Sequence, residues 1–449
     1  MTTSTGGVKL TTTYAAYISK TQPADTYSGQ VIYTLVHPSD HDAPVAHPAV
    51  LDTGRTVNAK LKSLAATVIN GAETTITPEF DPDSEDSEDW DLASDSYIKS
   101  IVVHLETPTP NGFTPTDTNT ISSSASNKPI YIVFDNTNDA GIMHFYTEGE
   151  QIFLSSDSSF MFYLLYELTT VSGINDWDTS NATDMSYMFH YAGYSASTFA
   201  LDLSSWDVSN VTNMSDMVWS AGYSATTWSI GDLSSWDVSN VTNMYSMFSD
   251  AGSYATTWSV GDLSSWDVSN VTNMSHMLSG ASSATTWSIG DLSSWDTSNV
   301  INMSYMFSGT GYSATTWSII GLSSWNTSSV TDMSRMFYSA GYDATAFILE
   351  ISDWNTSSVT NMSYMFYNAG YNSDTITINL PSWNTSSVTN MSSMFYNAGS
   401  SATSWSVTIP KTNDGTSIGP IANTTSAIYG NTTSINASAP SGRSFTLAN

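Results

Sequence analysis

Two hydrophobic periodicities alternate along residues 177–409 of this chain. In one representative repeat, the apolar residues that keep the spacing of one helix face are Val211, Met214, Met217 and Val218. The stretch 228–233 instead alternates apolar with polar residues, which is typical of a strand. Gly231 is one residue more than that alternation needs, and it fits a bulge. The pattern therefore predicts a strand, a turn, a short helix and a loop in every repeat.

Each repeat opens with a tryptophan, and consecutive tryptophans are 29 or 30 residues apart. The eight of them are Trp177, Trp206, Trp236, Trp266, Trp295, Trp325, Trp354 and Trp383. A fixed period in this range is typical of a solenoid, in which each repeat buries its apolar face only against its neighbours. We therefore predict an α/β repeat solenoid, with one parallel strand and one short helix in each coil. Its strands should stack about 4.8 Å apart.

Residues 1–126 do not repeat, and they predict a β-rich N-terminal domain. Strand-like alternation marks residues 8–18, 30–36 and 98–105. Residues 81–95 form an acidic loop whose alternate carboxylates are compatible with Ca²⁺, but the loop lacks the central glycine and the bidentate glutamate of a calcium loop. A solvated acidic loop is the simpler interpretation. The tract 107–127, rich in Pro, Thr and Ser, indicates a linker.

Atypical segments at both ends of the repeats predict caps. Residues 127–176 begin with a strong strand at 129–134 and contain, at 158–162, a degraded form of the repeat's Met-Ser-x-Met-Phe phrase. We predict that they cover the first coil as an N-terminal capping repeat. Residues 410–449 lose the period, and we expect a C-terminal cap with a short hairpin there.

The composition excludes several classes of protein. The 449 residues carry 41 acidic and 10 basic side chains, a net charge of -31, so nucleic acid is not an expected partner. Arg335 is the single Lys or Arg between residues 177 and 410. The chain has no cysteine and no run of about 20 apolar residues that would span a membrane. Neither end carries a leader or an anchor, so we expect a part of a larger exported protein.

Methionine, tryptophan and asparagine recur at fixed places in the repeats. Sixteen of the 19 methionines occupy two positions per repeat. A copper or haem methionine array is one interpretation, but methionine that fills the solenoid core is the simpler one. The tryptophans should lie at a core corner, with the indole N–H bonded to a backbone carbonyl. A ladder of side chains should bond the backbone of the next coil, through Asn213, Asn243, Asn273, Asn302, Asn361 and Asn390, with Asp184 and Asp332 at the same step.

The phrase Leu-Ser-Ser-Trp-Asp-Val-Ser-Asn-Val-Thr-Asn-Met-Ser-x-Met-Phe, which recurs through residues 177–409, resembles the repeat of one family. This is the BspA-like leucine-rich-repeat family of bacterial surface proteins, a repeat also found in mycoplasma lipoproteins. The resemblance implies a leucine-rich-repeat-like solenoid on a cell surface, associated with adhesion to host proteins or to other cells. It supplies no catalytic residue and no cofactor. The repeats here are longer because of an inserted loop, such as 221–226.

The inserted loop carries the candidate binding residues. They are Tyr194, Tyr223, Tyr254, Tyr312, Tyr342 and Tyr371. If exposed, these tyrosines form an aromatic ladder suited to sugars or to a protein hot spot. The alternative is a turn whose tyrosine packs over the helix end.

A second surface feature is a grid of hydroxyl groups that should point outward from the strands. Its members are Thr227, Ser229, Thr257, Ser259, Thr286, Ser288, Thr316 and Ser318. Because a regular hydroxyl grid orders water, ice binding is a minor alternative function.

We predict a non-catalytic protein, extracellular or on a cell surface, that recognises a host or neighbouring-cell surface protein or glycan. Self-association is also compatible with the pattern. The alternative is a structural spacer or filament subunit of the cell envelope without a ligand. We expect no enzyme activity, no cofactor and no metal site, because His190 and His276 stand at different offsets from their tryptophans and no Gly-x-Ser-x-Gly elbow occurs.

Overall fold

The computed structural model describes residues 48–70, 95, 97–409 and 446–447. All of them belong to the second of two compact units, His47–Asn449, and the first unit is Met1–Ala46. Three predictions lie outside the described residues: the strands at 8–18 and 30–36, the acidic loop 81–95 apart from Asp95, and the cap 410–449 apart from β14 (Thr446–Leu447).

A four-stranded sheet precedes the repeats, with the strand order β3-β4-β2-β6. Its strands are β2 (Ser100–His104), β3 (Ile130–Asp135), β4 (Ile142–Thr147) and β6 (Thr170–Val171). β2 pairs in parallel with both β4 and β6, whereas β3 and β4 form an antiparallel hairpin. The strands predicted at 98–105 and 129–134 are confirmed as β2 and β3. Because β2 pairs with strands on the far side of residue 126, the boundary predicted there falls within a shared sheet.

Helix α1 (Gly54–Asn70) adds a helix to the N-terminal region that the sequence predicts as β-rich, and it is the one α-helix among the described residues. It buries Val57, Leu61 and Ala65, which are four residues apart and share one face. The short strand β1 (Ala49–Val50) precedes the helix and pairs in parallel with β5 (Ile152–Phe153). The start of the described chain therefore folds back onto the segment that leads into the first coil.

Helix α1 takes the place of a coil at the N-terminal edge of the stack. In later coils the carbonyls equivalent to Met161 and Tyr163 accept N–H groups from the coil before, as when Met217 accepts from Phe189. Among the described residues no coil precedes Met161 and Tyr163, and the Asn58 side-chain amide donates to their carbonyls at 3.3 and 3.0 Å. A polar side chain of α1 thus closes a strand edge that would otherwise be open for pairing.

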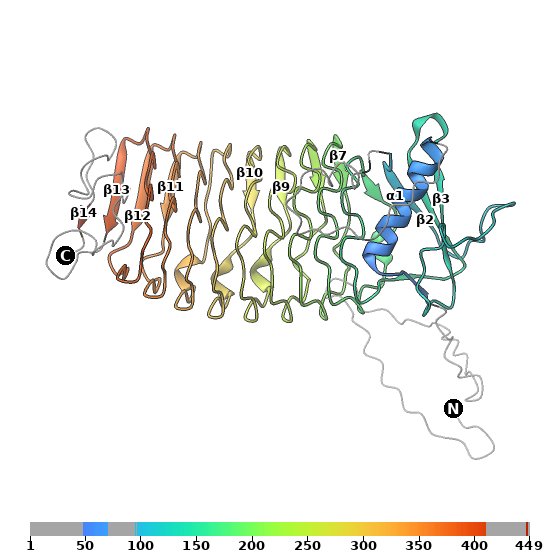
Figure 1. The fold of residues 1–449 in the computed structure, drawn as a ribbon. Helices are drawn as coiled ribbons and strands as arrows, with labels where there is room; N and C mark the ends of the chain where they lie inside the picture. The colour runs from blue at the N-terminus through green and yellow to red at the C-terminus, as the bar shows by residue number, and fades with distance from the viewer. Residues whose placement is uncertain (1–47, 71–94, 96, 410–445, 448–449) are drawn as a thin grey trace, which may run out of the picture. The chain divides into compact units, whose positions relative to one another are not determined.

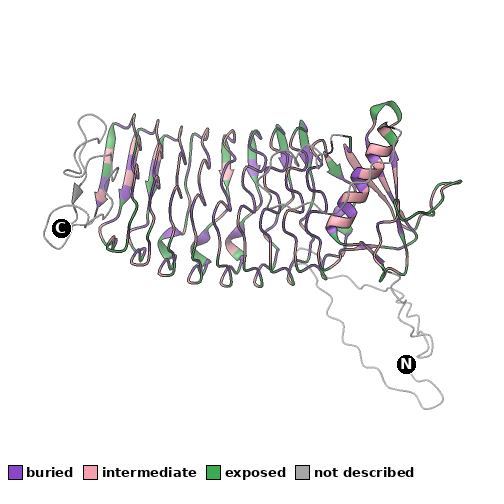
Figure 2. Cartoon of the chain, in the orientation of Figure 1, coloured by how far each residue is buried: buried purple, intermediate pink, exposed green. Residues whose placement is uncertain are grey.

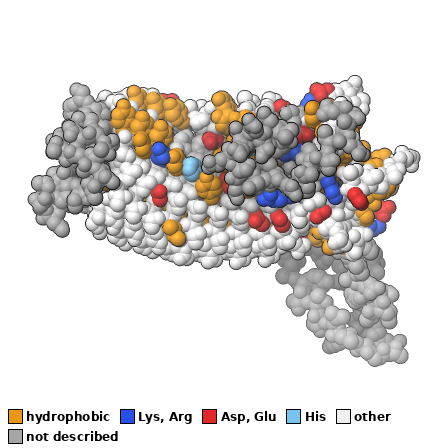
Figure 3. Space-filling view, in the orientation of Figure 1, with side chains coloured by type: hydrophobic (Ala, Val, Ile, Leu, Met, Phe, Trp, Pro, Cys, Tyr) orange, Lys and Arg blue, Asp and Glu red, His pale blue; other side chains and the backbone are white. Residues whose placement is uncertain are grey.

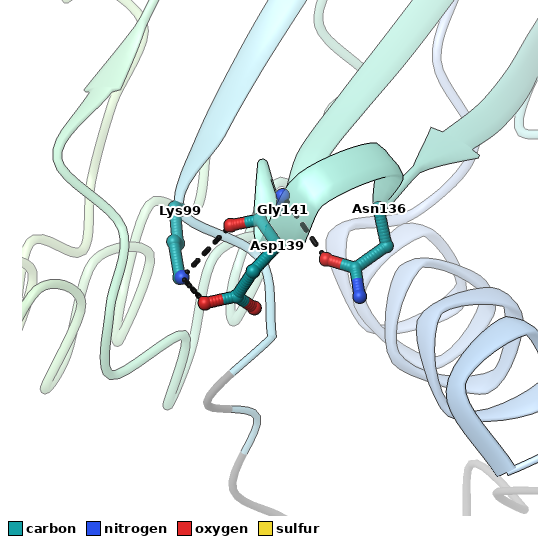
Figure 4. Close-up of polar contacts among 4 residues, drawn as sticks. All are labelled: Lys99, Asn136, Asp139 and Gly141. Atoms are coloured by element: carbon teal, nitrogen blue, oxygen red, sulfur yellow. Dashed lines mark hydrogen bonds and ion pairs between the residues drawn. The ribbon is translucent and has the colours of Figure 1, made fainter.

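The β3–β4 turn is held by polar contacts, which Figure 4 shows. Lys99 Nζ donates to Asp139 Oδ2 at 2.8 Å and to the Asp139 carbonyl at 3.0 Å, while Asn136 Oδ1 accepts from the Gly141 N–H at 3.2 Å. Asn138, Asp139 and Gly141 have φ of 56°, 60° and 61°, a left-handed conformation that these residue types tolerate best. The exposed Lys99–Asp139 pair contributes about 0–1 kcal/mol, so its main effect is to hold the turn in place.

Each repeat adds one coil, and the coils stack side by side with their strands aligned (Figure 1). The coil strands are β7 (Thr198–Ala200), β8 (Thr227–Ser229), β9 (Thr257–Ser259), β10 (Thr286–Ser288), β11 (Ala346–Leu349), β12 (Thr375–Asn379) and β13 (Ser404–Ile409). β7 pairs with β8, β9 with β10, and β12 with both β11 and β13, always in parallel. The predicted parallel stacking is confirmed, although β8 is shorter than the stretch 228–233 suggests.

The short helix predicted in every repeat does not form. Residues 214–221 make successive tight turns, in which the Met217 N–H donates to the Met214 carbonyl three residues back. The Met214 and Asp216 N–H groups leave the segment and donate to the next coil, to the carbonyls of Asn243 at 3.0 Å and Tyr245 at 2.8 Å. An α-helix would direct these donors along its own axis and leave neighbouring coils unbonded. The repeat is therefore a solenoid of strands and turns with little helix.

The helical pieces that the repeats do contain are single 3₁₀ turns. They are η2 (Ile174–Asp176), η3 (Leu263–Ser265), η4 (Leu292–Ser294) and η5 (Leu322–Ser324). The last three end at the residue before a repeat tryptophan, whose backbone is extended. They turn the chain at the corner that the tryptophan was predicted to mark.

The apolar face predicted for the missing helix is nevertheless buried. Val211, Met214, Met217 and Val218 are at most 1% exposed. The sixteen repeat methionines are at most 2% exposed, so their predicted place in the core is confirmed, and Figure 2 shows the buried residues along the interior of every coil. The spacing of apolar residues thus identifies what is buried without identifying the backbone conformation.

The repeat tryptophans tie each coil to the one before it. Trp206 Nε1 donates to the Ile174 carbonyl at 2.8 Å, and Trp236 Nε1 donates to the Leu203 carbonyl at 2.9 Å. The same bond recurs for Trp266, Trp295, Trp325, Trp354 and Trp383. The predicted role of the tryptophan, a buried corner with its indole N–H on a backbone carbonyl, is confirmed for these seven. It is wrong for Trp177, which is buried but whose indole N–H has no hydrogen-bond partner among the described residues.

Candidate binding surface

Three of the six predicted tyrosines form a ladder over the first coils. The Tyr194 and Tyr223 rings stack with 4.9 Å between their centres, and Tyr254 meets Tyr223 edge-on at 5.3 Å. Tyr254 is 55% exposed and the other two are half-buried. The ladder stops at the loop 280–283, which contains no tyrosine.

The other three tyrosines form a second, more regular ladder. Ring centres lie 4.3 Å apart between Tyr312 and Tyr342, and 4.8 Å apart between Tyr342 and Tyr371, with the planes within 11° of parallel. All three side chains are half-buried. Loss of water around the Tyr342 hydroxyl, and the neighbouring tyrosines, raise its pKa, so the hydroxyl stays neutral and can donate a hydrogen bond. The six predicted residues therefore come together as two groups of three.

Stacking decides which part of each ring a ligand can reach. A sugar binds a tyrosine mainly through the flat face of the ring, but in the second ladder Tyr342 has a neighbouring ring against both faces. The edge of the Tyr342 ring remains for contact. Such a surface suits interdigitating side chains better than a sugar ring.

A further tyrosine column has two of its three members in the same coils as the second ladder, and the sequence-based prediction does not include it. Tyr338 and Tyr367 stack at 4.9 Å, and Tyr367 and Tyr396 stack at 5.0 Å. Tyr396 is 42% exposed and the other two are half-buried. All three follow the Met-Ser-x-Met-Phe phrase directly, at the same place in three consecutive repeats.

A third column contains the single cation of the repeats. The Arg335 guanidinium carbon lies 5.1 Å from the Tyr305 ring centre and 4.6 Å from the Tyr364 ring centre, in the coils on either side. The His276 ring stacks on Tyr305 at 4.0 Å. Tyr364 also contacts Tyr367 of the neighbouring column at 5.6 Å. The two columns are therefore in contact.

We call these three columns together the tyrosine flank. Its members are Tyr305, Tyr312, Tyr338, Tyr342, Tyr364, Tyr367, Tyr371 and Tyr396. Figure 3 shows hydrophobic side chains, a class that includes tyrosine there, gathered over the coils near β11 and β12. The two columns that sequence reasoning misses occupy the variable positions of the Met-Ser-x-Met-Phe-x phrase. The signal that could have found these columns is the recurrence of tyrosine at one repeat position, as at 338, 367 and 396, since equivalent positions align from coil to coil in a solenoid.

The hydroxyl grid predicted on the strands does face solvent. Thr227, Ser229, Thr257 and Ser259 are exposed, and so are their counterparts in the next two repeats. The grid is interrupted at β11, where Ala346 and Ile348 take the outward positions and Ile348 is 50% exposed.

The predicted asparagine ladder forms, but its side chains make different bonds from those predicted. Asn213 bridges the coils through its backbone, while its side-chain Oδ1 accepts from the Ser215 N–H of its own coil at 3.1 Å. The amides that reach a neighbouring backbone come three residues earlier, as when Asn210 Nδ2 donates to the Ser180 carbonyl at 2.8 Å. A short polar side chain can accept the N–H two residues further on and so close a local turn. At Asn213 this local bond forms in place of the predicted bond to the backbone of the next coil.

The residue after each tryptophan from Trp206 onward changes charge midway along the repeats. It is Asp207, Asp237, Asp267 and Asp296 in the earlier coils and Asn326, Asn355 and Asn384 in the later ones. All seven side chains are exposed. The side-chain oxygen accepts the N–H two residues on in both cases, at 3.0 Å for Asp267 and 3.1 Å for Asn355. The turn therefore needs the oxygen and not the charge.

Polar groups are buried in the first two coils at positions where several of the following coils carry partly exposed tyrosines. His190 is 1% exposed, and neither ring nitrogen has a hydrogen-bond partner among the described residues. Burial lowers the pKa of His190 to about 3. Asp216 is also 1% exposed, and its burial raises the pKa to about 7 despite the neighbouring Tyr187 hydroxyl. Neither group is positioned to act on a ligand in solution.

Among the residues that the structure describes, no three His, Asp or Glu side chains are grouped so as to hold a metal ion. Within the same residues, no helix combines the length and the apolar character that crossing a membrane requires.

Stacked coils of short strands and tight turns, with aromatic columns on one side, define this chain as a repeat solenoid protein. The family described as "Mycoplasma protein of unknown function, DUF285" matches it three times in tandem, at residues 156–251, 222–341 and 311–413. These matches cover more than half of the 449 residues, and the chain belongs to that family. No curated protein and no solved structure matches the chain.

Proposed function

We propose that this protein is a non-catalytic adhesion protein of the BspA-like leucine-rich-repeat type, extracellular or on a cell surface, and that its tyrosine flank binds a partner protein. The observation that carries the proposal is the flank itself, with eight partly exposed tyrosines in three columns. Tyrosine and arginine are enriched where binding energy concentrates in protein interfaces. Rings already held by stacking lose little further freedom when a partner docks.

A protein is a better candidate than a glycan because of the stacking within each column. The ring faces that a sugar would cover are taken by neighbouring tyrosines, as for Tyr342 and Tyr367. What remains is a row of ring edges with their hydroxyl groups. A partner protein can place apolar side chains between the edges and accept hydrogen bonds from the hydroxyls.

The test is a triple variant, Tyr342→Ala, Tyr367→Ala and Tyr371→Ala, in the full chain. We expect binding to cultured host cells and to an arrayed panel of surface proteins to fall by at least about tenfold, since hot-spot tyrosines each contribute about 2 kcal/mol or more. Tyr97→Ala is the matched control, because Tyr97 is 37% exposed and lies outside the flank. Equal binding by the triple variant, or binding only to glycans, would contradict the proposal.

Two alternative functions can each be tested by a separate measurement. A structural spacer or filament subunit would bind none of the arrayed proteins or cells, and the triple variant would match the wild-type protein in every assay. Ice binding through the hydroxyl grid would appear as thermal hysteresis that Thr257→Val abolishes. The interruption of the grid at Ile348 makes that function a weaker match to the surface.

A further inference from the structure

Arg335 is the one basic side chain in the repeats that could attract an anionic group of a partner. It is the single Lys or Arg between residues 177 and 410 of a chain with a net charge of -31. Its guanidinium makes no hydrogen bond and no ion pair with any described residue. The side chain is half-buried, so part of it faces solvent.

The guanidinium is held in one orientation by its neighbours. Tyr305 and Tyr364 lie against it from the coils on either side, with 5.1 and 4.6 Å from the guanidinium carbon to the ring centres. His276 supports the outer face of Tyr305 at 4.0 Å. A cation between aromatic faces is stabilised without using its N–H groups, so those donors stay available at the edge of the plane.

A planar guanidinium with free donors is matched to one kind of group. Two of its N–H donors can meet the two oxygens of a carboxylate in parallel, a geometry that an ammonium group cannot reproduce. The surroundings restrict the partner further, because the negative charge of the chain repels a polyanion such as nucleic acid or a heavily sulfated glycan. A single carboxylate among apolar side chains satisfies both conditions.

We propose that Arg335 is the specificity-determining residue of the tyrosine flank and that it binds an Asp or Glu carboxylate of the partner protein. This inference rests on the proposed function, since it names the chemistry of the partner at the same surface. The partner segment places one carboxylate on the guanidinium edge and apolar side chains against the neighbouring tyrosine edges. Charge complementarity at a single point sets the register, and the tyrosines supply most of the contact area.

The experiment uses the full chain and a displayed library of random 12-residue peptides as the probe. Peptides that bind the wild-type protein are sequenced and synthesised, and each acidic residue is replaced by its amide. We expect every binder to contain an Asp or Glu whose replacement weakens binding about 10- to 100-fold, as for a hydrogen-bonded ion pair.

Two variants of Arg335 separate recognition from packing. Arg335→Tyr keeps an aromatic column, because Tyr305 and Tyr364 already occupy the equivalent position with the same positive φ, but it removes the cation. Arg335→Lys keeps the charge and removes the planar pair of donors. We expect both variants to melt like the wild-type protein. Arg335→Tyr should abolish the dependence on the peptide carboxylate, and Arg335→Lys should recover only a small part of it.

The outcomes distinguish this inference from the function on which it rests. Binders that lose affinity with Tyr371→Ala but ignore Arg335→Tyr would overturn the carboxylate inference and leave the flank as the binding surface. A library that yields no binder sensitive to either substitution would overturn both.

Discussion

The earlier and the later coils share one backbone and present two different surfaces. From Trp206 to Trp295 the residue after each tryptophan is an exposed aspartate, and from Trp325 to Trp383 it is an asparagine. The earlier coils bury His190 and Asp216, whereas the later coils place the partly exposed Tyr338, Tyr367 and Tyr396 at the position of His190. The hydrogen bonds that build the coil are the same in both halves.

This difference shows which parts of the repeat are fixed by the fold. Buried tryptophan and methionine, and a side-chain oxygen before each turn, occur in both halves because the coil does not close without them. Charge and aromatic character at the exposed positions vary because neither is needed for closure. The tyrosines of the later half are therefore free to serve binding, and the comparison between halves is open to four direct tests.

The largest expected change in stability comes from replacing a buried repeat tryptophan, and it should be the same in both halves. Trp266 and Trp354 are each 1% exposed and donate to a carbonyl of the preceding coil at 3.0 and 2.7 Å. Trp266→Ala and Trp354→Ala should each lower the free energy of unfolding by about 3–5 kcal/mol, through a cavity and an unpaired carbonyl. Denaturant-induced unfolding of each variant measures this loss of stability. A loss in one half only would show that the coils do not share one scaffold.

Asp216 should destabilise the earlier half at neutral and alkaline pH. Burial raises its pKa to about 7 in the folded chain, so the folded state loses stability as pH rises from the unfolded value toward 7 and above. Asp216→Ser should raise the free energy of unfolding at pH 8 by up to about 4 kcal/mol, and much less at pH 4. Serine already occupies this position at Ser246, with a φ of 50°.

The reverse substitution provides the control for Asp216. Ser246→Asp places a carboxyl at a position that is 2% exposed, and it should lower stability at pH 8 more than at pH 4. If neither substitution changes the dependence of stability on pH, the pKa of Asp216 is not raised in the folded chain.

His190 should make the earlier half sensitive to acid. Its pKa is lowered to about 3 in the folded chain, so the unfolded chain alone takes up the proton between about pH 6.5 and 3, and stability falls across that window. Between pH 7.5 and 4.5 this contributes a loss of about 2–3 kcal/mol. His190→Phe should remove that loss, whatever it does to stability at pH 7.5. Chemical denaturation at both pH values would show an unchanged difference if His190 were not responsible.

The smallest effect is expected from exchanging the charge between halves. Asp267→Asn in the earlier half and Asn355→Asp in the later half both keep the oxygen that accepts the N–H two residues on. Each should change the free energy of unfolding by less than about 0.5 kcal/mol, as exposed substitutions usually do. Thermal melts that shift by several degrees for either variant would mean that the charge takes part in forming the coil.

Much of this architecture could be predicted from the sequence because the same pattern recurs in eight repeats. A pattern that is ambiguous in one repeat becomes clear when all eight are compared. The eight tryptophans give the length of the coil, and the spacing of Met214 and Met217 identifies buried positions. Outward hydroxyls such as Thr257 follow from strand alternation. Each of these features depends only on which side of the chain faces the core.

Two features could not be predicted in this way: the backbone conformation of the turn segment and the full set of residues on the proposed binding surface. Helix spacing and a run of turns bury Val211, Met214 and Met217 equally well, and the choice between them depends on hydrogen bonds between coils. The columns of Tyr305 and Tyr338 were missed because they occupy variable positions of the repeat, where tyrosine occurs in some of the coils only. Helix α1 was missed because its packing partners, such as Met161, lie about a hundred residues away.

The central claim is that the coils from Trp295 onward bind through the tyrosine flank and that the coils before Trp295 do not bind. The most direct measurement compares partner binding by two triple variants of the full chain: Tyr194→Ala with Tyr223→Ala and Tyr254→Ala, and Tyr342→Ala with Tyr367→Ala and Tyr371→Ala. The first variant should bind cells and arrayed proteins like the wild-type chain, and the second should lose at least about tenfold in affinity. Equal affinities of the two variants, whether both retained or both lost, would contradict the claim.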